Sequence, residues 1–319
     1  MTIAQAIAGI DVAKETLDIA ILSPDGKYEM FSTATDAAGL KTLVRKLAKR
    51  GVGRVVLEAT GGLELCVMAA LDRAGLVFSR VNPRTVRDFA KAMNVLAKTD
   101  RIDARVLALF GERIRPLPTA MPDENDLELS ALALRRRQLV EDRQREKNRA
   151  ARARGAVCQA SIARMIDLLN DEIAVVDTQL RAKIEQSGDM ARRRDLADSV
   201  PGIAVNIATT LVVNLPELGR LSTRALKKLV GVAPLNDDSA KRQGQRHISG
   251  GRAHVRQALY MAAQTGYRHN QALKIFYDRL RAKGLGHKCA IIACVGKLIS
   301  ILNAIFKSGK AYDPKFATP

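Results

Sequence analysis

The sequence predicts an α/β N-terminal domain with a mixed sheet, a long helical hairpin and a mainly α-helical C-terminal domain. The expected strands, which are short, β-branched apolar runs, lie before residue 82, and such runs are typical of strands. A proline cluster follows, and proline-poor helical periodicity occupies much of the remainder. Because the chain has 319 residues, it is longer than one typical domain, and at least two domains are expected.

The N-terminal region begins with three expected strands over 4–11, 16–22 and 28–33, with a turn at Pro24-Asp25-Gly26. Alternating elements then follow: a helix over 37–49, a strand over 54–57, a helix over 63–74 and a strand over 77–81. Two further helical stretches come after Pro83, the second beginning near Asp100. Strands first and strand–helix alternation afterwards indicate a mixed sheet covered by helices.

Prolines mark the expected end of this domain. Pro116, Pro118 and Pro122 lie close together, and proline interrupts regular structure. From Asp126 to about Arg193 the chain lacks proline and alternates apolar with charged residues, which indicates two long helices packed as a hairpin or coiled coil. We therefore predict domains over 1–117, 118–195 and 196–319, the middle one being a helical linker that serves oligomerisation.

The charge balance points to a polyanionic partner. Lys and Arg total 52 against 33 Asp and Glu, which gives a net charge of +19. A Lys or Arg that neutralises a phosphate releases a counterion, so nucleic acid is the favoured partner; anionic lipid and ribosomal RNA are alternatives. Only 4% of the residues are aromatic and none is Trp, which favours recognition through backbone and shape over base stacking.

Cysteine usage and hydropathy indicate the compartment. The four cysteines form no CxxC or Cys/His ligand pattern, so reduced thiols are expected. The sequence shows no basic leader before an apolar stretch, and its longest apolar run, from Cys289 to Gly296, is far shorter than the roughly 20 residues of a membrane span. A cytoplasmic protein without a membrane partner is expected.

Four acids form a candidate metal site. Asp11 lies inside an apolar strand, and Glu58 ends another apolar run; a charge at such a position is costly unless a partner or a metal compensates it. Asp100 and Asp103 are spaced i, i+3 and share one helical face. Hard oxygen ligands favour Mg²⁺, with Mn²⁺ as the alternative.

Each acid also has a purely structural interpretation. Asp100 could be a helix N-cap, and Asp103 could favour the helix dipole. Asp11 could be a buried structural acid and Glu58 a surface acid at a strand end. The combination of all four favours the metal site over these separate accounts.

Several motifs carry a family resemblance. In the first domain they are Gly9-Ile10-Asp11-Val12-Ala13-Lys14, Glu58-Ala59-Thr60-Gly61, Val81-Asn82-Pro83 and Lys98-Thr99-Asp100-Arg101-Ile102-Asp103-Ala104-Arg105. They resemble the N-terminal domain of the transposases of insertion sequence family 110, which is similar to the RuvC Holliday-junction resolvases. Further motifs resemble the C-terminal domain of the same family: Ser199-Val200-Pro201-Gly202-Ile203, Gly231-Val232-Ala233-Pro234 and Arg256-Gln257-Ala258-Leu259-Tyr260-Met261.

The resemblance implies an RNase-H-like (RuvC-like) N-terminal domain and a catalytic site. Its four carboxylates would be Asp11, Glu58, Asp100 and Asp103, and they would bind Mg²⁺. It also implies a serine nucleophile in the C-terminal domain, where the position matching the family is Ser239; Ser249 is the competitor. Because nothing near Ser239 in the sequence could activate its hydroxyl, activation would come from the distant carboxylates, in a composite site formed within one chain or between two.

The basic stretch around Ser239 is expected to bind nucleic acid. Phosphate contacts are predicted for Lys241, Arg242, Arg246, Arg252 and Arg256. The partners implied by the resemblance are donor and target DNA and a structured bridge RNA that guides the choice of target. Proteins of this kind act as dimers that pair into tetramers, so a homo-oligomer in the bacterial cytoplasm, associated with the nucleoid, is expected.

Three functions are distinguished by simple tests. The first is a recombinase that moves its own element by metal-assisted, serine-mediated strand exchange. A Holliday-junction resolvase-like nuclease that uses only the carboxylates would keep cleaving after Ser239→Ala. A non-catalytic nucleic-acid-binding protein would be unaffected by Asp11→Ala, but acids at a nucleic-acid surface repel phosphate unless a metal intervenes, which argues against it.

Overall fold

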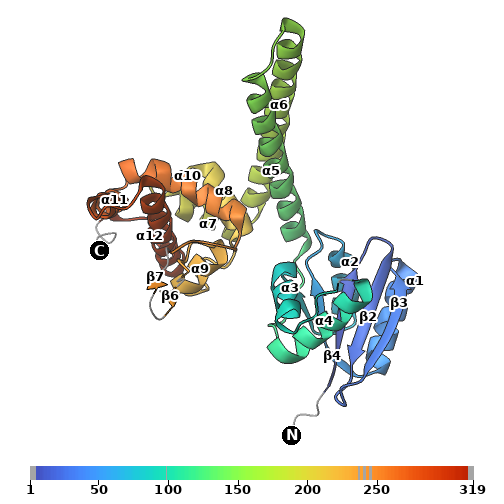
Figure 1. The fold of residues 1–319 in the computed structure, drawn as a ribbon. Helices are drawn as coiled ribbons and strands as arrows, with labels where there is room; N and C mark the ends of the chain where they lie inside the picture. The colour runs from blue at the N-terminus through green and yellow to red at the C-terminus, as the bar shows by residue number, and fades with distance from the viewer. Residues whose placement is uncertain (1–4, 98, 236–237, 240–241, 244–245, 315–319) are drawn as a thin grey trace. The chain divides into compact units, whose positions relative to one another are not determined.

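The computed structural model describes residues 5–97, 99–235, 238–239, 242–243 and 246–314 (Figure 1). The chain divides into two compact units, Met1–Pro122 and Asp123–Pro319. Each unit has its own hydrophobic core, so each is described by itself.

Unit 1 is built on a five-stranded sheet with strand order β3-β2-β1-β4-β5. Its elements are β1 (Ala6–Val12), β2 (Thr16–Leu22), β3 (Tyr28–Ala34), α1 (Ala37–Lys49), β4 (Val52–Glu58), α2 (Glu64–Arg73), β5 (Phe78–Val81), α3 (Pro83–Ala92) and α4 (Asp100–Ile114). The first three strands are antiparallel neighbours, whereas β4 pairs parallel with β1 and with β5. The predicted mixed sheet with helices is confirmed.

The alternation of side chains along β1 and β4 divides unit 1 into layers. Ile10 and Leu57 pack with Leu43 of α1 and Val67 of α2 in one core. Val56 points to the opposite face, where it packs with residues of α3 and α4. Successive residues of a strand face opposite sides, so Gly9, Asp11 and Glu58 belong with Val56 on the face that α4 covers (Figure 1).

Unit 2 begins with a helical hairpin. Its elements are α5 (Glu124–Ala150), α6 (Ala156–Gln186), α7 (Gly188–Asp198), α8 (Val205–Asn214), α9 (Thr223–Val230), β6 (Asp238–Ser239), β7 (Arg242–Gln243), α10 (Ala253–His269), α11 (Gln271–Ala282) and α12 (His287–Ser308). Leu129 and Leu139 of α5 pack against a seam on α6 that includes Leu169, Ile173 and Leu180. The hairpin is present as expected, but a separate helix, α7, begins where Ser187 accepts a hydrogen bond from the Met190 amide at 3.4 Å.

In the described part of unit 2, the other named elements are helices, apart from the antiparallel β6–β7 pair. Helix α10 begins at Ala253, so Arg256 lies in its first turn. Within the described residues, one helix, α12, is long and apolar enough to cross a membrane by length and composition. Its most apolar window is 56% buried, and Cys294, Leu298 and Leu302 lie in the core of unit 2. Helix α12 is therefore buried in the way expected for a core helix.

Candidate active site

The acids of unit 1 meet at the edge of the sheet where β1 and β4 end. Asp11 is the second-last residue of β1, and Glu58 is the last residue of β4. Ile10 is in register with Leu57 across this parallel pair, so Asp11 and Glu58 lie at neighbouring positions on the same face. Both are half-buried, as expected for polar groups at the open end of a covered sheet.

Gly9 brings helix α4 against this face. A Cβ atom at Gly9 would lie 2.2 Å from the Ala104 carbonyl oxygen and 2.3 Å from the Ala108 amide nitrogen. Only glycine permits such a close approach between strand and helix backbones. Because Asp11 is two residues beyond Gly9, its side chain projects beside the first turn of α4.

The first turn of α4 supplies the remaining predicted acids. Thr99 caps the helix by accepting a hydrogen bond from the Ile102 amide at 3.3 Å. Asp100 and Asp103 follow in the first turn, where the helix dipole favours negative charge. The N-cap is therefore Thr99, and the interpretation of Asp100 as the cap is wrong.

The negative charges of these acids affect the pKa of Asp11. Burial, then the negative charges of Asp100, Asp103 and Asp18, raise the pKa of Asp11 from 3.8 to about 6. A carboxyl group surrounded by like charges is stabilised by a proton or by a cation. The negative charge gathered around Asp11 is the property that a cation-binding site requires.

Asp18 is a neighbour of Asp11 that the sequence analysis did not select. It pairs directly with Asp11 across the antiparallel β1–β2 ladder, and its Oδ1 accepts a hydrogen bond of 2.6 Å from Ser32 Oγ on β3. The sequence contained a signal for Asp18, because this acid also interrupts an apolar strand. The strand register that places Asp18 opposite Asp11 could not be read from the sequence.

Glu64 is a second acid that sequence reasoning missed. It is 3% exposed, and its Oε2 accepts hydrogen bonds from the Thr60 amide at 3.1 Å, the Thr60 hydroxyl at 2.9 Å and the Gly62 amide at 2.8 Å. Burial acts to raise its pKa, but these hydrogen bonds together lower it. Glu64 therefore holds the turn that follows Glu58.

The carboxylate oxygens of these acids are suitable ligands for a divalent cation, although the side chains do not form a compact ligand group. Within the residues that the structure describes, no group of three or more His, Cys, Asp or Glu is arranged as metal ligands. What Asp11, Asp100 and Asp103 share is electrostatic proximity. Carboxylate oxygens are the donors preferred by Mg²⁺ and Mn²⁺.

In unit 2 the candidate nucleophile lies in the β6–β7 hairpin. Ser239 pairs with Arg242, and Asp238 pairs with Gln243. Leu235 forms a bridge with His247 across the base of this segment. Lys241 lies outside the described residues. The competitor Ser249 is exposed, and so is Arg246.

Two of the predicted phosphate-binding arginines, Arg252 and Arg256, make internal contacts near the start of α10. Arg252 contacts both carboxylate oxygens of Glu217, at 2.7 and 2.6 Å, and donates to the Asn214 carbonyl oxygen at 2.9 Å. Arg256 donates to the carbonyl oxygens of Val230, at 3.1 Å, and Gly250, at 2.7 Å. Bidentate guanidinium–carboxylate pairs fix geometry, so these side chains hold the start of α10 from within the protein.

Glycines complete this anchoring. A Cβ at Gly251 would lie 2.4 Å from the Gly231 amide nitrogen, so the two backbones are in direct contact. Gly202, in the Pro201-Gly202-Ile203 turn, has φ +99° and would place a Cβ 2.4 Å from Gly266 Cα of α10. That turn therefore packs against a helix, and this contact accounts for the glycine.

Two family models match the chain. Residues 8–153 match the model of the DEDD transposases of IS110, described as "Transposase". Residues 194–278 match that of the "Transposase IS116/IS110/IS902 family". Together they cover most of the chain. It belongs to the IS110 family of transposases.

Curated relatives agree with this placement. The pilin gene-inverting protein of Moraxella bovis is 26% identical over 96% of this chain and 97% of that protein. The insertion element IS900 42 kDa protein of Mycobacterium paratuberculosis is 24% identical over 98% of each chain. The Thermus thermophilus RuvC structure aligns with 36% of this chain and 99% of its own at 15% identity, with a TM-score of 0.28.

Family membership makes this IS110 transposase a DNA-recombining enzyme. DNA is its partner, and a DEDD transposase depends on a divalent metal ion. The predicted fold class, with a mixed α/β N-terminal domain and a helical C-terminal region, is confirmed.

The structure of the transposase groups the predicted site residues in two places. Asp11, Asp100 and Asp103 interact electrostatically in unit 1, with Glu58 on the neighbouring strand end. Ser239 and Arg242 lie on the small hairpin of unit 2. Sequence reasoning missed Asp18 and Glu64, which hold or tune the acidic edge, and Glu217, which fixes Arg252.

Proposed function

We propose that this transposase moves its element by serine-mediated strand exchange that requires the carboxylates Asp11, Glu58, Asp100 and Asp103 together with Ser239. The observation that carries the proposal is the convergence of acids around Asp11, whose pKa is raised to about 6 by burial and by Asp100, Asp103 and Asp18. Folding brings like charges together at a cost, and a bound divalent cation offsets that cost.

In the proposed reaction, Ser239 Oγ bonds to a DNA phosphorus while the bond from that phosphorus to a sugar oxygen breaks. The seryl proton is transferred to a carboxylate base, and the released sugar oxygen takes up a proton. Attack by a sugar hydroxyl of another strand on the phosphoserine then restores the serine. One phosphodiester is broken and one is formed, so no external energy source is needed.

The carboxylates would hold Mg²⁺, or alternatively Mn²⁺. A divalent ion at such a site stabilises the charge that develops on phosphate oxygens during phosphoryl transfer. At neutral pH Asp11 is largely ionised, since its pKa is about 6, and it is available as a ligand. Glu64 keeps the turn after Glu58 in place through its hydrogen bonds to Thr60 and Gly62.

We further propose that target choice rests on a structured bridge RNA that pairs with donor and target DNA. The net charge of +19 and the 4% aromatic content support binding through phosphates and helical shape. Lys241, Arg242 and Arg246 are the loop residues proposed to contact phosphate, because Arg252 and Arg256 are engaged in internal contacts. A homo-oligomer would bring donor and target together.

Inversion of a DNA segment is a second candidate outcome of the same chemistry. Two relatives, from Moraxella bovis and Moraxella lacunata, are named pilin gene-inverting proteins, and each is 26% identical over 96% of this chain. Strand exchange between two sites in inverted orientation on one molecule inverts the DNA between them. Substrate orientation would then decide between inversion and transposition.

The test is recombination of plasmids that carry the element's ends and flanking RNA-coding sequence, in direct and inverted orientation. Wild type, Ser239→Ala, Ser249→Ala and Asp11→Asn are compared, and protein–DNA adducts are detected on denaturing gels with labelled DNA. We expect Ser239→Ala and Asp11→Asn each to lose recombination and the adduct, with Ser249→Ala retaining both.

An adduct that persists in Ser239→Ala and disappears in Ser249→Ala would move the nucleophile to Ser249. Cleavage that survives in both serine variants, without any adduct, would replace the proposal with the resolvase-like nuclease. Recombination that is independent of the bridge RNA would remove the guiding role of RNA and leave the strand exchange intact.

A further inference from the structure

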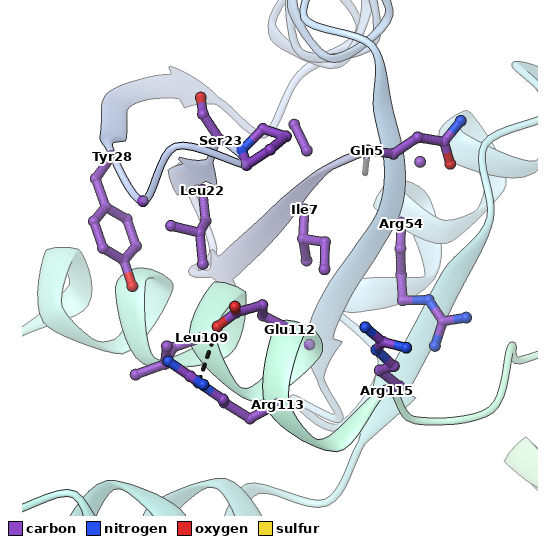
Figure 2. Close-up of a pocket in the computed structure, with 15 residues that line it drawn as sticks. Gln5, Ile7, Leu22, Ser23, Tyr28, Arg54, Leu109, Glu112, Arg113 and Arg115 are labelled. Atoms are coloured by element: carbon purple, nitrogen blue, oxygen red, sulfur yellow. Dashed lines mark ion pairs between the residues drawn. The ribbon is translucent and has the colours of Figure 1, made fainter. Parts of the chain in front are cut away.

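A pocket of about 730 Å³ lies in unit 1 at the end of the sheet opposite the acids (Figure 2). It is bounded by the beginnings of β1 and β4, the end of β2 and the last turn of α4, and its lining includes Ile7, Leu22 and Leu109. Along β1, Ile7 precedes Asp11 by four residues, which corresponds to about 13 Å. This volume is within the usual range of ligand sites.

The charged lining of this pocket is dominated by arginine. Arg54, Arg113 and Arg115 line it together with a single acid, Glu112. Arg113 Nε contacts Glu112 Oε2 at 3.1 Å (Figure 2), so the one carboxylate is already paired. Arg54 donates to the Pro116 carbonyl oxygen, which fixes its position at the pocket wall. The pocket therefore keeps an excess of positive charge.

Arg115 is held in an unusual backbone conformation. It is the C-cap of α4 with φ +50° and ψ +58°, a left-handed conformation in which glycine or asparagine is favoured. Its side chain is exposed, and in the part of the chain that the structure describes its guanidinium makes no hydrogen bond or ion pair. Arginine at this position strains the backbone and presents a free cation to the pocket.

The last turn of α4 also determines what kind of anion can bind here. Its amide groups are used within the helix, and its carbonyl end carries partial negative charge, so an anion has to be held by the guanidinium groups. Guanidinium forks match phosphate oxygens in geometry. A single carboxylate would fill little of a cavity of this volume, whereas a segment of nucleic-acid backbone is large enough to occupy it.

We propose that Arg54, Arg113 and Arg115 form a phosphodiester-binding site that holds a nucleic-acid backbone at the opposite end of α4 from the carboxylates. Duplex DNA and structured RNA share this chemistry, and the experiment distinguishes them. The site contacts the backbone and not base edges, so it contributes affinity and register without sequence preference. This proposal is independent of the proposed strand-exchange reaction, because nucleic-acid binding is measured without a divalent metal ion.

The test measures the salt dependence of binding by the full chain in EDTA, with a random-sequence DNA duplex and with an unrelated hairpin RNA. Arg113→Gln/Arg115→Gln is compared with Arg45→Gln/Arg73→Gln. The control removes the same charge from exposed arginines of α1 and α2, on the other face of the sheet. The slope of log K against log salt should fall in magnitude by about 1 to 2 in the pocket variant, and the affinity by about tenfold.

A change with DNA alone identifies duplex DNA as the occupant, a change with RNA alone identifies RNA, and a change with both shows a common phosphate site. Equal effects of the two double variants, or no effect of the pocket variant, would overturn the proposal. Arg115→Gly guards against misfolding: it should raise the melting temperature by relieving the left-handed strain, while it weakens binding. Weaker binding together with a lower melting temperature would count against the site.

Discussion

The two ends of helix α4 carry opposite charges and are built in opposite ways. At the N-terminal end, Asp100 and Asp103 lie beside Asp11 because Gly9 allows helix and strand backbones to touch. At the C-terminal end, Arg113 and Arg115 surround an open pocket. The 15 residues of α4 separate the two ends by about 22 Å.

Both ends follow the helix dipole, yet their consequences differ. Acids are favoured at the start of a helix and bases at its end, so local electrostatics accounts for the sign of each charge. At the acidic end, α4 packs closely on β1, and burial, followed by the negative charges of neighbouring acids, raises the pKa of Asp11. At the basic end, the cations stay exposed. The same helix thus suits a cation at one end and a phosphate at the other.

The largest effect is expected from disrupting the close contact between Gly9 and α4 while every acid is kept. Gly9→Ala places a Cβ 2.2 Å from the Ala104 carbonyl oxygen, so α4 has to move. We expect a loss of about 3 kcal/mol in the free energy of unfolding and loss of recombination. Urea denaturation and the plasmid assay measure both.

Gly188→Ala is the matched control. Gly188 begins α7, and a Cβ there would meet nothing within 4 Å, so stability should be unchanged or slightly higher. If Gly9→Ala kept wild-type stability and activity, close packing of α4 would not be what brings the acids together.

A smaller effect concerns pH. Because the pKa of Asp11 is raised from 3.8 to about 6, the folded state binds this proton more tightly than the unfolded state does. The contribution of Asp11 to the stability of the metal-free protein should therefore be lost as the pH rises from about 4 to 6. The loss is on the order of 1 kcal/mol, after discounting the shift for the solvent exposure of a half-buried group.

Asp11→Asn should lack this loss and be more stable than wild type at pH 8 in EDTA. Added Mg²⁺ should raise the melting temperature of wild type at pH 8 and leave that of Asp11→Asn nearly unchanged. Thermal melts at pH 4.5 and 8 measure both effects. Equal pH dependence of the two proteins would show that Asp11 does not sense its acidic neighbours.

The smallest effect is expected from Asp18→Asn, which removes one of the like charges near Asp11. The pKa of Asp11 should fall by a fraction of a unit, as followed by carboxyl NMR titration, and recombination should persist. Asp25→Asn is the control, since Asp25 lies in an exposed turn and pairs with Lys27. A larger loss of activity in Asp18→Asn than in Asp11→Asn would make Asp18 the principal ligand.

Much of unit 1 could be predicted because its signals are local. The helix over 37–49 has the predicted bounds, and the strands around Asp11 and Glu58 differ by only a few residues. An acid within an apolar strand indicated Asp11 as a site residue. The same signal at Asp18 was insufficient by itself, because the register that opposes it to Asp11 arises from strand pairing.

The roles of the arginines in unit 2 could not be predicted. Arg252 and Arg256 have the composition of a phosphate-binding loop, but Arg252 binds Glu217, 35 residues away, and Arg256 binds backbone carbonyls. From the sequence alone, a charged side chain indicates only that some oppositely charged or polar partner is required. Whether that partner is a phosphate or a carboxylate of the same chain depends on which segments pack together.

The sequence by itself predicted the order of strands and helices in unit 1 and a polyanionic partner. It also selected Asp11, Glu58, Asp100 and Asp103 as candidate site residues, because periodicity, charge and motifs are properties of neighbouring residues. The tertiary structure decided that Gly9 seats α4 on β1, that Glu64 holds the turn after Glu58, and that Arg54 joins Arg113 and Arg115 around one pocket. These contacts join residues far apart in the chain, and the packing of whole elements brings them together.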